Sequence, residues 1–390
     1  MLAINADLYW RASLENSDQR SALVSRVASC RVRLKGLSVD TSSPVCVAVI
    51  GCGAWGPNHA RVFNTLPDSR LVAAADVDRG QLERMGVVHP DLRLETDYLT
   101  LVRDNRIEAV VVATPTGTHY AIVKAALEAG KHVLCEKPLC ESEQQGKELG
   151  ELAGRTRTVL MVGHTFLFNP GLNKIKELVV SGEIGQFRYL SSVRTNLGPV
   201  RRDVNAAYDL AAHDIAIFNW LLETEPEMVS AIGASFLQPG IEDVVLISMK
   251  YPNNVLASVH ASWLDPKKVR QITVVGSLRM ATWNDLELST PVAIYEKGFD
   301  VQTSTSDYGE FLRLAMWDGD VRLPKVQLEE PLKVQARSFL SAVRGRTPLD
   351  RSGPEFSVGV VRVLEAVGKS LEMNGQPITI PTRRLFKQGA

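Results

Sequence analysis

Three side chains in this sequence have the types and the spacing needed to move a proton. Asp209 and His213 are at positions i and i+4, so on a helix they would share one face, where a carboxylate fixes the tautomer of an imidazole and raises its basicity. Lys137 precedes Pro138, which disfavours helical backbone at the lysine and permits a cis bond between the two. A partly desolvated lysine exchanges protons near neutral pH. Each signal is weak alone, because a solvated loop lysine or a structural Asp–His pair explains it as well.

A glycine-rich turn precedes these residues. Gly51, Gly53 and Gly56 form the pattern G-x-G-x-x-G directly after the apolar run 45–50 and at the start of an expected helix over 55–66. In a dinucleotide-binding turn the first glycine permits the tight turn, the second lets the backbone approach a pyrophosphate, and the third lets the helix pack on the strand. The free N–H groups at the helix N-terminus favour the pyrophosphate charge.

The acidic residue that completes this pattern is Asp76, at the end of the next expected strand. Its carboxylate would accept hydrogen bonds from the adenosine ribose and repel a 2′-phosphate, so the sequence favours NAD over NADP. Arg79 nearby keeps NADP as an alternative. A methyltransferase, which also uses a glycine-rich turn, and a turn without a ligand are the remaining alternatives.

The elements around these residues predict a parallel sheet. Short apolar strands alternate with helices, which is typical of βαβ units, and ligands of such folds bind at the carboxyl edge of the sheet, where Lys137 should lie. The expected strands are 45–50, 71–75, 109–113, 132–135 and 158–162, and the expected helices after the first are 118–129 and 141–154.

The pattern changes after His164 and predicts a second domain. Asn169 and Pro170 resemble an N-cap and first residue of a helix that ends near Gly182. Strand-like segments then dominate and indicate a larger, mostly antiparallel sheet, interrupted by one helix and followed by two more. The strands are expected at 187–196, 244–251, 255–263, 269–276 and 280–283, and the helices at 206–222, 332–344 and 354–373.

Composition excludes several classes of protein. The 390 residues carry 44 Lys+Arg and 44 Asp+Glu, so net charge gives no reason to expect a nucleic-acid partner. The five cysteines form no CxxC pair, which argues against a disulfide framework or a metal site and favours a reducing compartment. No apolar run is long enough for a membrane span, and the first 30 residues hold no apolar signal core. We expect a cytoplasmic protein with no membrane or nucleic-acid partner.

Four segments resemble a known family when taken together. The segments GCGAWGPNHAR, ATPTGTHY, HVLCEKPL and DLAAHD occur in the order and spacing of the Gfo/Idh/MocA family, and the resemblance covers about residues 45–385. It implies an α/β fold, with an N-terminal Rossmann domain over 44–165 and a C-terminal α/β domain with an open, mostly antiparallel sheet over 166–390. The last helices would pack back on the Rossmann domain. Residues 1–43 have no counterpart and are expected to be an extension.

The resemblance also implies roles for individual residues. Lys137, Asp209 and His213 would be the catalytic group, and Ala211 departs from the glycine that the family has in D-x-G-x-H. Thr114, Pro115, Thr116 and His119 would line the nicotinamide side, and Glu136 would contact the cofactor ribose. The full cofactor-binding set is Gly51, Gly53, Ala54, Trp55, Gly56, Asp76, Thr114, Pro115, Thr116, His119, Glu136 and Lys137.

The segment 194–205 resembles the branch of the family that acts on nucleotide sugars, such as UDP-N-acetylglucosamine 3-dehydrogenases. Arg194, Arg201 and Arg202 could clamp a diphosphate or a carboxylate. Trp263 would add an aromatic face, and Lys267, Lys268 and Arg270 more cations, unless the two lysines belong to a solvated loop. The substrate-binding set is Arg194, Asn196, Arg201, Asn205, His213 and Trp263.

The implied reaction is NAD-dependent oxidation of a secondary alcohol of a sugar or nucleotide sugar, expected at C3. His213 would be the base, oriented by Asp209, with Lys137 stabilising the alkoxide, although the roles of Lys137 and His213 could be exchanged. The alternatives are a free sugar or polyol (inositol-type) dehydrogenase, an NAD-dependent glycosidase and a non-enzymatic NAD-binding regulator. A homodimer or homotetramer is expected, because the strand at 244–251 would expose apolar residues on an uncovered sheet face.

Overall fold

The computed structural model describes residues 43–306, 309–349 and 351–381. Residues 1–42 of the expected extension lie outside the described residues. The two sheets described below belong to one compact unit, Pro44–Ala390.

The first sheet confirms the parallel fold predicted from the sequence. Its six strands run in the order β3-β2-β1-β4-β5-β6, and every pairing is parallel. This is the doubly wound order of dinucleotide-binding domains. The strands are β1 (Val45–Ile50), β2 (Ser69–Ala75), β3 (Arg93–Glu95), β4 (Ala109–Val112), β5 (His132–Cys135) and β6 (Leu160–Val162).

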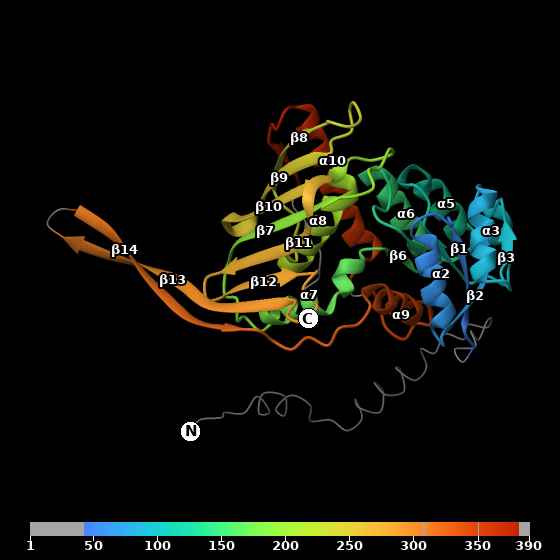
Figure 1. Ribbon diagram of the computed structural model, residues 1–390, viewed down its shortest axis with the longest axis horizontal. Helices are drawn as coiled ribbons and strands as arrows, with labels where there is room; N and C mark the ends of the chain where they lie inside the picture. The colour runs from blue at the N-terminus through green and yellow to red at the C-terminus, as the bar shows by residue number, and fades with distance from the viewer. Residues whose placement is uncertain (1–42, 307–308, 350, 382–390) are drawn as a thin grey trace, which may run out of the picture. The chain divides into compact units, whose positions relative to one another are not determined.

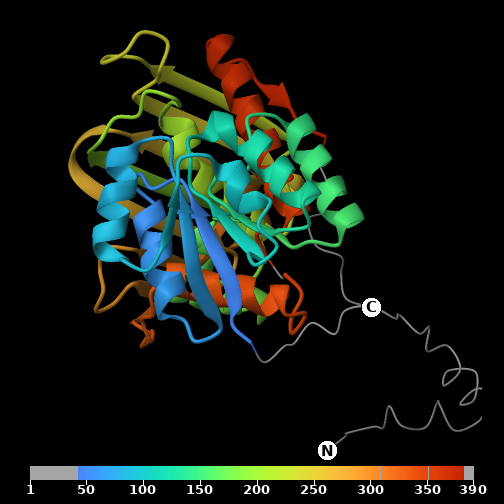
Figure 2. The same cartoon turned by 90° about the vertical axis from the view of Figure 1, so that its right-hand side faces the viewer.

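Alternate residues of β1 pack into two separate cores, which explains why the whole strand is apolar. Val47 and Val49 lie in one cluster with Phe63 of α2, and Ala48 and Ile50 lie in another with Ile122 of α5. Neither face of such a strand contacts solvent, so apolar residues occupy both faces. The helices of this part are α2 (Gly56–Thr65), α3 (Arg79–Val88), α4 (Tyr98–Val102), α5 (Thr116–Glu128) and α6 (Glu143–Thr156), and Figure 2 shows helices on both sides of the sheet.

The second sheet has nine strands in the order β14-β13-β12-β11-β7-β10-β9-β8-β15 (Figure 1). All of its pairings are antiparallel except that of β10 with β7, so the prediction of a mostly antiparallel sheet is confirmed. The strands are β7 (Phe187–Leu197), β8 (Met228–Ala234), β9 (Val244–Tyr251), β10 (Val255–Ser262), β11 (Leu264–Gly276), β12 (Met280–Asn284), β13 (Val292–Ser306), β14 (Gly309–Arg322) and β15 (Ile378–Thr379).

Among the described residues, helices cover one face of this sheet and leave the other uncovered by helix. Residues of β9 alternate between buried and exposed, as expected for a sheet with one solvated face. The cap of α7 is as predicted, because the Asn169 side chain accepts a hydrogen bond from the Gly171 N–H at 2.8 Å. The remaining helices are the 3-10 turns Thr165–Phe168 and Pro252–Asn254, α7 (Pro170–Val180), α8 (Ala212–Leu222), α9 (Pro331–Val343) and α10 (Pro354–Glu372).

The helix predicted over 206–222 is wrong in its first turn. Residues Ala207–Ala211 form a π-helical turn, and α8 begins only at Ala212. A π-helical turn places residues five apart, instead of four, next to each other. This change of period affects Asp209 and His213.

The last two helices connect the two sheets. Helix α9 lies beside α2 (Figure 1), and the ring of Phe339 in α9 packs edge-on against Phe63 in α2 at 6.3 Å. Arg362 in α10 is 7% exposed and forms ion pairs with Glu143 of α6, at 2.8 Å, and with Glu225, which precedes β8. Among the described residues, no helix combines the length and the apolar character needed to cross a membrane.

Candidate active site

A single large cavity runs from the carboxyl edge of the first sheet to the second sheet. Its volume is about 1530 Å³, which exceeds the roughly 300–1,000 Å³ typical of a pocket for one small molecule. The first sheet contributes Gly51, Asp76 and Thr114 to its lining, and the second part of the chain contributes His213 and Trp263. The cavity therefore has room for a dinucleotide and a second ligand.

The glycine-rich turn has the geometry that its three glycines predicted. Gly51 has φ +95°, and a Cβ there would lie 2.6 Å from the carbonyl carbon of Ala113. A Cβ on Gly56 would lie 1.9 Å from the Gly51 oxygen, so α2 packs closely on this turn. A Cβ on Gly53 would meet no atom within 4 Å. Open space above Gly53 at the start of α2 fits a pyrophosphate.

Asp76 lies at the edge of the cavity with a fixed carboxylate. One oxygen accepts a hydrogen bond from the Cys52 N–H at 2.6 Å and the other from the Asp78 N–H at 2.8 Å. These bonds hold the acidic group beside the glycine-rich turn, where it was expected to face a ribose.

Two of the four residues predicted to line the nicotinamide side lie behind the cavity wall. Thr114 and Pro115 line the cavity, whereas Thr116 and His119 are buried and are not among its lining residues. The ring nitrogens of His119 lie 2.9 Å from the Pro138 oxygen and 2.8 Å from the Thr114 oxygen. His119 therefore fixes the two loops that carry Thr114 and Lys137, and the prediction that it faces the cofactor is wrong.

Lys137 is buried at the carboxyl end of β5, and the interpretation as a solvated loop lysine is wrong. The residue is 8% exposed, lines the cavity and is joined to Pro138 by a cis bond. Burial lowers the pKa of Lys137, against the opposing effect of the Asp209 and Glu136 charges. Glu136 itself is held by His59 at 2.7 Å. Burial raises the pKa of this carboxyl, but the combined effect of the His59 bond and charge and of the Lys137 charge and backbone N–H lowers it below its usual value.

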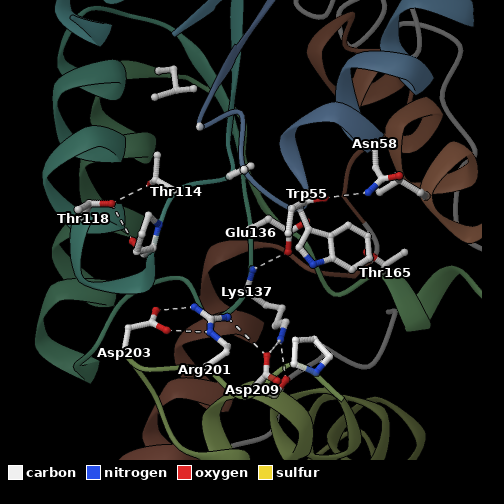
Figure 3. Close-up of a pocket in the computed structure, with 18 of the residues that line it drawn as sticks. Trp55, Asn58, Thr114, Thr118, Glu136, Lys137, Thr165, Arg201, Asp203 and Asp209 are labelled. Atoms are coloured by element: carbon white, nitrogen blue, oxygen red, sulfur yellow. Dashed lines mark hydrogen bonds and ion pairs between the residues drawn. The ribbon is translucent and has the colours of Figure 1, made fainter. Parts of the chain in front are cut away.

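Asp209 collects three donors around one carboxylate, and two of them, Lys137 and Arg201, are labelled beside it in Figure 3. Lys137 Nζ lies 3.4 Å from Oδ1 and donates to the main-chain oxygen of Asp209 at 2.6 Å. Arg201 Nη1 lies 3.5 Å from Oδ1, and Trp263 Nε1 donates to Oδ2 at 3.2 Å. Asp209 thus connects a lysine of the first sheet to an indole of the second.

His213 is not paired with Asp209, so the orientation predicted from their spacing is wrong. The π-helical turn removes the i, i+4 geometry, and the donors named above occupy the carboxylate. His213 Nδ1 is buried with no hydrogen-bond partner among the described residues, and its ring packs edge-on against Phe166 at 4.8 Å. Burial and the charges of Lys137 and Arg194 lower the pKa of His213 well below 6.5, so the imidazole is neutral.

Most arginines of the cavity are paired with carboxylates. Arg194 lines the cavity but is 3% exposed and forms two bonds to the buried Asp214, at 2.8 and 2.9 Å, so the guanidinium that was predicted to clamp a substrate anion already has a carboxylate partner. Arg270 is 3.0 Å from Asp285, and Arg201 pairs with Asp203. Arg202 is the lining arginine for which the described residues provide no carboxylate.

Other predicted substrate residues also have structural partners. Trp263 contributes to the cavity lining but is only 1% exposed, so it offers little aromatic face for stacking. Asn205 lies outside the cavity lining, where it donates to Glu242 at 2.7 Å. Asn196 lines the cavity as predicted, whereas Lys267 and Lys268 are exposed and do not line it. Contacts between residues far apart in the chain therefore determine which predicted side chains can reach a substrate.

Phe166 is a cavity residue that the sequence analysis missed. Its ring centroid lies 4.4 Å from the Arg194 guanidinium carbon and 5.6 Å from that of Arg270. Phe166 therefore packs between two cations and against His213. Its position shortly after β6, at the same sheet edge as Lys137, is the signal that could have identified it.

The turn, the buried lysine and the shared cavity together define an NAD-binding oxidoreductase of two-domain type. Family models agree: the oxidoreductase family with an NAD-binding Rossmann fold matches residues 45–164, and the GFO/IDH/MocA C-terminal domain matches residues 172–282. The chain belongs to the Gfo/Idh/MocA family, as the resemblance predicted.

Three proteins of known name or structure are similar to this chain. Inositol 2-dehydrogenase 2 of Saccharopolyspora erythraea is 32% identical over 55% of this chain and 65% of its own length. A protein of known crystal structure from Magnetospirillum magnetotacticum is 30% identical, with a TM-score of 0.71, over 83% of this chain and 99% of its own. The fold is shared by UDP-N-acetylglucosamine 3-dehydrogenase of Acidithiobacillus ferrooxidans, with 21% identity and a TM-score of 0.72 over 85% of this chain and 99% of the other.

Proposed function

We propose that this protein is an NAD-dependent dehydrogenase that oxidises a secondary alcohol on the ring of a sugar or cyclitol. The observation that carries the proposal is the position of Lys137, a buried lysine in contact with Asp209 inside the cavity that also contains the glycine-rich turn. NAD bound at that turn supplies the hydride acceptor.

The residues of the cavity suggest how the hydroxyl proton is removed. Lys137 has a lowered pKa, so a neutral amine is available to accept the proton, and the Asp209 carboxylate beside it stabilises the resulting ammonium. His213 is neutral and can hydrogen-bond the reacting hydroxyl without competing for the proton. These roles exchange the ones first assigned to Lys137 and His213.

The charge pattern favours an uncharged substrate. Arg194, Arg201 and Arg270 are each neutralised by a neighbouring carboxylate, so they offer little free charge for a diphosphate. Similarity to an inositol 2-dehydrogenase supports the same choice. A free sugar or polyol is therefore the first candidate. Arg202 supports a second candidate, a nucleotide sugar oxidised at C3, because its guanidinium is available for an anionic group.

A substrate panel tests the proposal. NADH formation is measured by absorbance with inositols, free pyranoses and UDP-linked pyranoses, and NAD binding is measured separately by fluorescence. We expect the highest kcat/KM with an uncharged polyol. Release of a sugar without net NADH would indicate the glycosidase alternative, and NAD binding without redox on any substrate would indicate a regulator.

We also propose a homodimer or homotetramer formed through the uncovered face of the second sheet. Tyr189, Ile232, Leu246 and Leu256 are 47%, 56%, 47% and 56% exposed on β7 to β10. They lie on one face by register, since Ile232 pairs with Leu246 and Leu256 with Tyr189. Contiguous exposed apolar residues indicate an interface. Sedimentation of the wild type and of Leu246→Glu checks it, with dissociation expected only in the variant.

A further inference from the structure

We infer that Trp263 and Arg201 are positioning residues for proton transfer, which act through Asp209 by sharing the carboxylate that faces Lys137. The inference rests on the proposed function, because it assigns both residues to the proton step of that reaction. Neither side chain needs to touch the substrate for this role.

Trp263 is fixed on the second sheet at the junction of β10 and β11. Its backbone N–H donates to the Asp243 oxygen at 3.0 Å, and its side chain is almost completely buried. The indole is a donor only, and its single N–H points at Asp209 Oδ2, at 3.2 Å. A buried indole without this acceptor would lose its hydrogen bond, so Trp263 and Asp209 fix each other.

Arg201 approaches Asp209 from the segment that precedes the π-helical turn (Figure 3). Two nitrogens of its guanidinium bind Asp203, at 2.9 and 2.5 Å, and the third lies 3.5 Å from Asp209 Oδ1. The Gln238 side chain donates to the Arg201 carbonyl oxygen at 2.9 Å and ties this segment to the loop after β8. The guanidinium is therefore held at the cavity rim in a set orientation.

These donors share the negative charge that faces Lys137. The charged and titratable groups around Lys137 are Asp209 on the π-helical turn, Glu136 on its own loop, Arg201, His213 on α8 and His164 after β6. Trp263 and Arg201 compete with Lys137 for the Asp209 carboxylate. They therefore weaken the stabilisation that Asp209 gives to the ammonium form of Lys137. Arg201 adds repulsion between like charges.

Removal of either donor should therefore raise the pKa of Lys137. Oxidation requires a neutral Lys137, so kcat/KM rises with pH through the pKa of this residue. A hydrogen bond to a charged group corresponds to about one pKa unit. In Trp263→Phe we expect the rising limb to move about 1 pH unit toward alkaline pH. The rate at low pH then falls roughly 10-fold and recovers at high pH.

A second tryptophan provides a matched control. Trp283 is fully buried in the same sheet, and its Nε1 has no hydrogen-bond partner among the described residues. Trp283→Phe removes the same atoms without removing a hydrogen bond. We expect its pH profile to superimpose on that of the wild type, and thermal melting curves check that both variants are folded.

Variants of Arg201 test the second donor. Arg201→Gln should move the rising limb of the pH profile in the same direction as Trp263→Phe. Arg201→Lys keeps the positive charge, so its profile should lie between those of Arg201→Gln and the wild type. Arg322→Gln is the control, because Arg322 pairs with Glu183 and Glu296 at the sheet edge away from the cavity.

Competitive acetylation of Lys137 with acetic anhydride, followed by mass spectrometry, gives its pKa without any substrate. A raised pKa in Trp263→Phe and Arg201→Gln supports the inference. If the pH dependence of Lys137 acetylation in both variants equals that of the wild type, the inference is overturned, even if activity falls. A wild type that is labelled normally but oxidises no alcohol contradicts the proposed function instead.

Discussion

Lys137 Nζ lies 2.6 Å from the main-chain oxygen of Asp209, and this contact joins the two halves of the protein. Lys137 follows a strand of the parallel sheet, and Asp209 lies in the π-helical turn associated with the second sheet. The pair proposed to handle the proton therefore forms only when both halves are folded together, and mutations of either residue should affect chemistry more than cofactor binding.

Substitution of Lys137 tests the central residue. Lys137→Ala should reduce kcat by roughly 100- to 10,000-fold, because it removes the proton acceptor. The NAD dissociation constant should change little, since the glycine-rich turn is untouched. Stopped-flow rates and fluorescence titration measure the two quantities. Lys147→Ala, at a half-buried lysine of α6 outside the cavity lining, is the control. Near-wild-type turnover of Lys137→Ala would contradict the role of Lys137 as proton acceptor.

His213 should matter as a neutral hydrogen-bonding group. His213→Ala should reduce kcat by roughly 100-fold or more, and His213→Gln should recover part of the loss because an amide can also hydrogen-bond the hydroxyl. The pKa of His213 is well below 6.5, so its removal should leave the pH dependence of kcat/KM unchanged. Loss of a limb near pH 6.5 in His213→Gln would identify a titrating imidazole and contradict this role.

Two glycines of the turn should respond differently to the same change. Gly56→Ala places a Cβ 1.9 Å from the Gly51 oxygen, so we expect a markedly lower melting temperature. Gly53→Ala meets no protein atom within 4 Å, so the variant should fold normally and lose NAD affinity, by about 10-fold or more, because its Cβ occupies the space for the pyrophosphate. Equal affinity in Gly53→Ala and wild type would exclude pyrophosphate binding at this turn.

Asp76 should set the preference for NAD over NADP. Asp76→Asn removes the negative charge that would repel a 2′-phosphate, and we expect the ratio of kcat/KM for NADP to that for NAD to rise about 10-fold. Steady-state rates with each cofactor measure the ratio. Asp97→Asn, which changes the N-cap of α4, is the control. An unchanged ratio would show that another residue determines the preference.

The Glu136–His59 pair should make stability depend on pH. The pKa of Glu136 is lowered from 4.5 in the folded state, so its carboxylate stabilises the fold above pH 4.5, and this contribution disappears as pH falls through the lowered value. Glu136→Gln should reduce the free energy of unfolding by about 2 kcal/mol at neutral pH. Urea titrations at neutral and acidic pH should show a difference that shrinks on acidification. If the difference in free energy of unfolding between wild type and Glu136→Gln stays constant with pH, ionisation of Glu136 does not contribute to stability.

The sequence predicted the elements that have strong apolar patterns. Strands β1 and β4 were identified because burial on both faces makes them continuously apolar, and β5 because three apolar residues follow His132. Strand β3 (Arg93–Glu95) was missed, since it has three residues, two of them charged, at a sheet edge. The turn at 207–211 was read as α-helix because nothing in the side-chain pattern distinguishes a π-helical turn.

The site was predictable where local sequence determines it. The glycines and Lys137 act through backbone geometry and position at a strand end, which local patterns reveal. Arg194 and Trp263 pair with residues 20 and 54 positions away, and only the fold brings these partners together. A long-range ion pair and a long-range hydrogen bond therefore engage two side chains that were expected to contact the substrate.

Arg362 limits how freely the two halves of this protein can be exchanged with those of relatives. Its buried guanidinium binds Glu143 of the nucleotide-binding half and Glu225 of the second half, so it serves both at once. A chimera that replaced either half would leave a buried charge without its partner, at a cost of about 3–5 kcal/mol. Recombination with relatives, in evolution or in the laboratory, should therefore succeed only when these three residues are transferred as a set.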